Sequence, residues 1–123
     1  VSRGDPRVAA KAALVCWRLA GYPEFIKRLA LYNTHKSSLS NINALAETLR
    51  RQGHLQEPGL KELYSHSLGL LNTLLCLKEV RKQATNHLDD LLVLATHAVE
   101  EEEQDNDSQH EAESHDLGPK LAA

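Results

Sequence analysis

Apolar residues recur at intervals of three and four positions along most of the chain, and nowhere do apolar and polar residues alternate with period two. This spacing is typical of amphipathic helices and argues against a fold built from strands. The intervals predict helices over five segments, residues 6–20, 23–33, 41–52, 60–82 and 87–99. The linkers between these segments are short, as they are in helical bundles.

Residues that commonly begin or end helices stand at the expected places. Asp5 can act as an N-cap, and Pro6 follows it at the first helical position. Gly21 and Gly53 follow the last apolar positions of their segments, where glycine commonly ends a helix. These signals fix the ends of the first and third predicted helices.

Two boundaries are less clearly marked. Residues 34–40 are polar and are predicted to form a turn, after which Ser40 or Asn41 caps the third helix. The apolar pattern weakens again near Asn86. There the pattern leaves open two alternatives, a separate last helix or one helix that runs straight through.

The segment 60–82 is apolar over most of its circumference, which is typical of a helix in the middle of a bundle. Its apolar positions are Leu60, Leu63, Tyr64, Leu68, Leu70, Leu71, Leu74, Leu75, Cys76, Leu77 and Val80. We therefore predict an all-α fold, a compact up-and-down bundle of four or five helices over residues 5–99.

Charge divides the chain into two parts. Residues 1–99 carry thirteen basic and eight acidic residues, whereas residues 100–116 carry nine acidic residues and no lysine or arginine. An acidic segment with so few apolar residues buries too little surface to order itself, so residues 100–119 are predicted to be a disordered tail. Residues 1–4 are interpreted as a short extension and residues 120–123 as a cloning remnant.

The 123 residues suit a single domain, and only five of them are aromatic. The chain contains no methionine, which indicates a domain excised from a longer protein. Two cysteines cannot form a disulfide framework, and no apolar run reaches the roughly 18 residues that span a bilayer. These features favour an intracellular protein, cytoplasmic or nuclear.

No arrangement of residues indicates catalysis or metal binding. The sequence lacks a nucleophile elbow, a phosphate-binding glycine loop and the paired ligands of a zinc site. Its seven histidines are scattered over several segments. We therefore expect a protein that is not an enzyme and that has no metal and no cofactor.

Two segments, 71–75 and 88–92, match the pattern L-x-x-L-L, in which three leucines of one helix can dock into a groove on a partner. Any leucine-rich core helix produces the same letters. Because both segments fall within predicted core helices, we interpret their leucines as core residues.

The preferred function is a protein–protein interaction domain, an adaptor or scaffold that binds a partner helix in a groove between its own helices. The groove is expected beside the segment 60–82, where apolar residues exceed what one neighbouring helix can cover. Exposed members of Leu70, Leu77 and Val80 would contact the partner. A basic rim of Lys78, Arg81 and Lys82 would favour an acidic amphipathic helix.

Basic residues support an alternative, binding of nucleic acid or an anionic membrane with the acidic tail as an intramolecular competitor. The residues of this predicted basic patch are Arg7, Lys11, Arg18, Arg50 and Arg51, with Arg3 extending the row on the first helix. Self-association through the leucine-rich helix is a third possibility.

Overall fold

The computed structural model describes residues 5–102, which form six helices and no strand. Five of the helices are α1 (Pro6–Ala20), α2 (Pro23–Leu31), α3 (Thr34–Gln52), α4 (Leu60–Leu74) and α5 (Lys78–Thr85), and residues 88–102 form the sixth. The prediction of an all-α bundle is confirmed, but the predicted number of helices is wrong. Most of the predicted acidic tail lies outside the described residues, although residues 100–102 continue the last helix.

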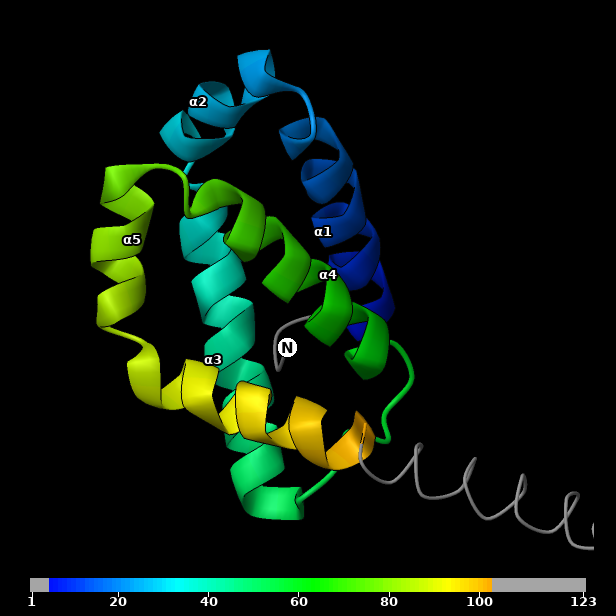
Figure 1. Ribbon diagram of the computed structural model, residues 1–123. Helices are drawn as coiled ribbons and strands as arrows, with labels where there is room; N and C mark the ends of the chain where they lie inside the picture. Colours follow the sequence, from blue (N-terminus) through cyan, green and yellow to red (C-terminus); the bar gives the residue numbers. More distant parts are fainter. Residues whose placement is uncertain (1–4, 103–123) are drawn as a thin grey trace, which may run out of the picture.

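Helix α4 lies at the centre of the bundle, packed against both α1 and α3 (Figure 1). Helix α5 leads from the end of α4 to the 88–102 helix, which crosses α3 instead of running along it (Figure 1). The largest fully enclosed side chains of the core are Ile42, Leu45, Leu60, Leu63, Leu70, Leu74, Val80 and Leu94.

The helix predicted over residues 60–82 is in fact two helices, because the chain turns between Leu74 and Lys78. Leu77 has an extended backbone with φ −91° and ψ 131°. Arg81 stabilises the turn, since its Nη1 donates hydrogen bonds to the carbonyl oxygens of Leu75 at 2.9 Å and Cys76 at 3.0 Å. These bonds satisfy carbonyl groups that the end of a helix leaves without an intrahelical partner.

The structure also resolves the two unclear boundaries. Helix α5 ends at Thr85 and Asn86 follows as its C-cap, so the last helix is separate. Helix α3 begins at Thr34, directly after Asn33 with its positive φ of 59°, so the turn predicted for residues 34–40 is wrong. Part of that polar stretch faces the core, because Ser38 is buried although it is polar.

Helix α1 packs against α4 through small residues and through Trp17. Its buried side includes Ala10, Ala13 and Ala20. Opposite them, a methyl group added at Gly69 of α4 would overlap the indole ring of Trp17. Small side chains at a helix contact let the two axes lie close together.

The start of α4 is equally close to the start of α1. Gly59 precedes α4 with a φ of +88°, a conformation that favours glycine. A Cβ atom at this position would lie 2.7 Å from the backbone nitrogen of Arg7. Glycine at position 59 therefore lets the first turn of α1 pack against the N-terminal end of α4.

His35 is a buried residue of α3 whose two ring nitrogens have no hydrogen-bond partner within residues 5–102. Burial lowers the pKa of His35, the nearby charge of Lys36 lowers it further, and Glu79 acts in the opposite direction. The folded protein therefore favours the neutral ring.

Because the pKa of His35 is lower in the folded state than in the unfolded state, the domain should lose stability as the pH falls below about 6.5. The loss continues until the lowered folded pKa is reached, with a slope of up to about 1.4 kcal/mol per pH unit. His35→Leu should remove this component, which urea unfolding at several pH values would measure. His54→Leu, the same change at an exposed histidine, is the matched control. An unchanged pH slope in His35→Leu would show that the ring accepts a proton in the fold.

Candidate functional site

The 88–102 helix meets the rest of the bundle through a mixed apolar and polar side. Leu94 is completely buried, and Leu91 and Val93 pack at the edge of the core. The hydroxyl group of Tyr64 on α4 donates a hydrogen bond of 2.7 Å to the carbonyl oxygen of Leu94. This helix is therefore attached to α4 by both packing and a hydrogen bond.

A buried carboxylate fixes the rotation of the same helix against α3. Asp90 accepts a hydrogen bond of 2.9 Å from Nδ2 of Asn43 and forms an ion pair of 2.9 Å with Nη1 of Arg50. Nδ1 of His87 lies 3.9 Å from the carboxylate. Burial opposes the ionisation of Asp90, but its bonds to Asn43 and Arg50 outweigh that effect and hold its pKa below the usual value. Rotating the helix would separate the buried carboxylate of Asp90 from these two partners, which would cost free energy.

Because Asp90 and Leu94 face inward, the opposite side of the helix faces solvent. Leu88, Leu92 and Val99 are 53%, 62% and 55% exposed, and Ala95 between them is exposed as well. Intervals of four, three and four residues place these four side chains in one row on the helix surface. We name this row the C-terminal stripe.

The charged residues of the 88–102 helix that flank the C-terminal stripe are acidic. Asp89, Glu100 and Glu102 are exposed, and residues 88–102 contain no lysine or arginine. Asp89 and Glu100 stand eleven positions apart, which places them on the same side of the stripe. The stripe is therefore an apolar row with an acidic rim.

A second exposed apolar row runs along α1. Val8 and Val15 are 65% and 57% exposed, and Ala12 and Leu19 continue the row at the same intervals of four, three and four. We name it the α1 stripe. The exposed residues beside it are basic, Arg7, Lys11 and Arg18.

The two L-x-x-L-L segments have different surroundings. In residues 71–75, Leu71 and Leu74 are buried, as the core interpretation predicted. In residues 88–92, Leu91 packs against the core, but Leu88 and Leu92 belong to the C-terminal stripe, so the core interpretation is wrong for these two leucines. The physical reason is that Asp90, not the leucine pair, faces α3.

The groove predicted beside the segment 60–82 lacks most of the apolar side chains that were expected to contact a partner. Leu70 is 2% exposed and Val80 is fully buried, so neither can contact a partner, and only Leu77 is partly exposed. The turn after α4 directs Val80 into the core. Among the predicted rim residues, Lys78, Arg81 and Lys82 are all exposed, and Arg81 caps carbonyl groups of that turn.

The predicted basic patch is partly neutralised by acidic neighbours. Arg7 pairs with Asp5 at 3.0 Å, and Arg50 pairs with Glu47 at 2.8 Å and with Asp90. Lys11, Arg18 and Arg51 are exposed and form no ion pair within the described part of the chain. Arg3 lies outside the described residues.

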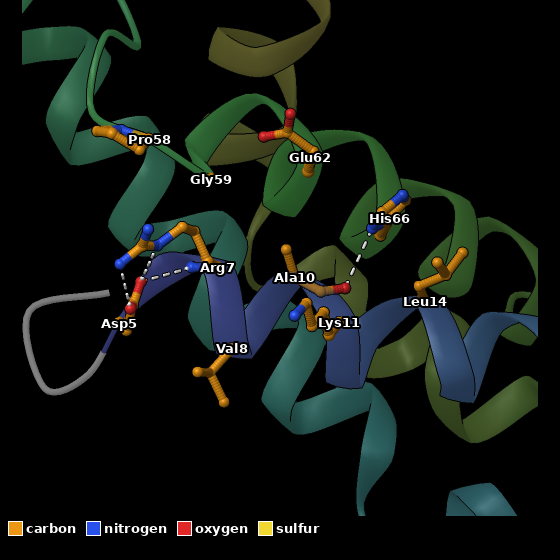
Figure 2. Close-up of a pocket in the computed structure, with 10 residues that line it drawn as sticks. All are labelled: Asp5, Arg7, Val8, Ala10, Lys11, Leu14, Pro58, Gly59, Glu62 and His66. Carbon is orange, nitrogen blue, oxygen red and sulfur yellow. Dashed lines mark hydrogen bonds and ion pairs between the residues drawn. The ribbon is translucent and has the colours of Figure 1, made fainter.

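A cleft of about 610 Å³ lies between the start of α1 and the start of α4 (Figure 2). Three of its polar side chains, those of Asp5, Arg7 and His66, already have partners within the fold. Arg7 is bonded to Asp5. Nδ1 of His66 donates to the carbonyl oxygen of Ala10 at 3.1 Å. In Figure 2 the side chain of Glu62 points away from both pairs. The arrangement fastens α1 to α4 and brings together no nucleophile with a base.

Within residues 5–102, no three histidine, cysteine, aspartate or glutamate side chains lie close enough to hold a metal ion. Over the same residues, no helix combines the length and the apolar character that crossing a membrane requires. Comparisons with protein-family models, curated proteins and solved structures found no match for this chain. The fold and its exposed surface thus define an all-α helical bundle with two apolar stripes of opposite rim charge.

Proposed function

We propose that this domain is a non-catalytic protein–protein interaction module that binds an amphipathic partner helix along the C-terminal stripe. The observation that carries the proposal is the row of Leu88, Leu92 and Val99, each more than half exposed, on a helix whose other side is fixed by Asp90. Contiguous exposed apolar surface commonly marks an interaction site. Burying it contributes about 25 cal/mol for each Å² removed from water.

The rim of the stripe determines the chemistry of the partner. Asp89, Glu100 and Glu102 would repel an acidic helix and attract a basic one. The partner is therefore an amphipathic helix with lysine or arginine beside its apolar row, in contrast to the acidic helix expected from the sequence. The α5 rim of Lys78 and Lys82 fits an acidic helix but has only Leu77 beside it as an apolar contact.

We also place the module inside the cell. Cys16 and Cys76 are both free thiols, which suits a reducing compartment. An adaptor or scaffold role follows if the helix that the stripe binds belongs to another protein.

The docking site can be tested with a synthetic helix of about 15 residues, which spans the stripe at 1.5 Å per residue. Its apolar row should carry leucines at intervals of four, three and four, with lysines on both sides. We expect this peptide to bind the full chain, and Leu92→Lys to raise its Kd roughly tenfold or more. Fluorescence anisotropy at about 1 µM protein measures the binding directly.

Two controls make the result specific. The same peptide with glutamates in place of lysines should bind more weakly, because the rim is acidic. Val15→Glu alters an equally exposed apolar residue on α1 and should leave the Kd unchanged. Equal binding to Leu92→Lys and to the unmodified chain would rule out the stripe as the docking site.

The electrostatic alternative rests on Lys11, Arg18 and Arg51, the members of the basic patch that have no acidic partner within the described residues. Three separate cations support only weak, salt-sensitive attraction to phosphates. Binding of duplex DNA or anionic liposomes that Lys11→Glu and Arg18→Glu abolish would favour this alternative over helix docking.

A further inference from the structure

The two stripes have the same spacing of apolar residues and rims of opposite charge. Each is an apolar row with intervals of four, three and four residues, so each extends over roughly 17 Å of helix. The rim of the α1 stripe is basic, with Lys11 and Arg18, and the rim of the C-terminal stripe is acidic, with Asp89 and Glu100. Both rows are exposed in the same molecule, so they do not cover each other within one chain.

We infer that a second copy of this chain occupies the C-terminal stripe through its own α1 stripe. This inference rests on the proposed function, since it names the helix that the docking surface receives. The α1 stripe is an apolar row flanked by basic residues, which is complementary to the acidic rim of the C-terminal stripe. The contact joins two different surfaces, so each copy offers one stripe of each kind.

The sequence of residues 103–119 does not contain an equivalent apolar row. Residues 103–119 contain only Ala112 and Leu117 as apolar side chains and carry six acidic residues. They could be attracted to Lys11 and Arg18, but they cannot cover Val8, Val15 and Leu19 with a matching apolar row. Their charge also repels the acidic rim of the C-terminal stripe.

A contact between two different surfaces has a definite consequence for assembly. Copies joined in this way either close, as a symmetric pair that exchanges two such contacts or as a ring, or each copy adds to the next in an open series. A single helix–helix contact is smaller than the interface of a stable complex, so the association is expected to be weak and to depend on concentration.

The test is a mixing experiment with two full-length variants. Val15→Glu places an acid on the α1 stripe, and Leu92→Lys places a base on the C-terminal stripe. Each variant alone should have a self-association Kd roughly tenfold or more above that of the unmodified chain. An equimolar mixture should regain association, because the intact α1 stripe of one variant meets the intact C-terminal stripe of the other. Sedimentation velocity from about 1 µM to about 1 mM covers the range of weak association.

Leu31→Glu is the matched control, since Leu31 is 80% exposed but belongs to neither stripe. It should associate like the unmodified chain, and circular dichroism should show that all three variants remain helical. Association of Val15→Glu alone at full strength would mean that two C-terminal stripes pair with each other, which overturns the inference.

Self-association of the chain and binding of the peptide distinguish a failure of the second-copy contact from a failure of the docking surface. If the unmodified chain is monomeric up to about 1 mM while the lysine-flanked peptide still binds at Leu92, the docking surface stands and the second copy is not its occupant. If the chain is monomeric and the peptide does not bind, both proposals are wrong.

Discussion

Leu94→Ala is expected to lower the free energy of unfolding by about 2–5 kcal/mol, whereas Leu92→Ala should change it by less than about 0.5 kcal/mol. The two leucines are separated by one residue on the same helix, but Leu94 is fully buried and Leu92 is 62% exposed. Truncating Leu94 leaves a cavity in the core, while truncating Leu92 removes surface that water already contacts. Urea unfolding followed by circular dichroism measures both changes.

The pair of variants is also a test of how the 88–102 helix is rotated. The measurement should be made at about 1 µM protein, so that any self-association does not add to the apparent stability. The opposite ranking, a large loss for Leu92→Ala and a small one for Leu94→Ala, would place the C-terminal stripe in the core. Both docking proposals would then be wrong.

Gly69→Ala is expected to destabilise the domain by roughly 1–3 kcal/mol, although alanine is the better helix former. The added methyl group would overlap the Trp17 indole, which packs against Gly69. Because Trp17 also lies against His66, with ring centroids 6.1 Å apart, the indole cannot move without losing a contact. Thermal unfolding should show Tm lower by about 4–8 °C for each kcal/mol lost.

The sign of this effect depends on Trp17. In a Trp17→Leu background the overlap is gone, and Gly69→Ala should become stabilising by up to about 1 kcal/mol through helix propensity alone. A double-mutant cycle between the two positions measures the coupling. Equal effects of Gly69→Ala in both backgrounds would mean that α1 and α4 are farther apart than the structure places them.

Local signals in the sequence predicted much of the fold. The N-cap at Asp5 is confirmed, since its Oδ1 accepts a 2.9 Å hydrogen bond from the backbone nitrogen of Arg7, and α3 ends before Gly53. The break after Leu74 could not be predicted in this way, because neither glycine nor proline marks it. The carbonyl groups there are capped by Arg81, which lies several residues further along the chain.

The candidate site was harder to predict, because helical spacing shows which residues share a face but not which way that face points. On the 88–102 helix the answer depends on Asp90 and its partners Asn43 and Arg50, at least forty positions away in the sequence. A buried carboxylate at that place has no local signature.

On α1 the usual preference of large apolar residues for the core points to the wrong side of the helix. The helix has one row of small residues, with Ala13 and Ala20, and another with Val8 and Val15. Large apolar residues usually face the core, so the valine row is the natural choice for the inner side. The structure has the opposite side of α1 facing inward, with Ala10, Ala13 and Ala20 buried and the Trp17 indole packed against Gly69 of α4.

The separation of the two sides of the 88–102 helix has a consequence for how this protein can evolve. Asp90 and Leu94 hold the helix in place, and the outward residues contribute little to that attachment. Substitutions at Leu88, Leu92 or Val99 can therefore accumulate with little cost in folding stability. The exposed surface of this helix can therefore change in a few steps while the scaffold that carries it stays the same.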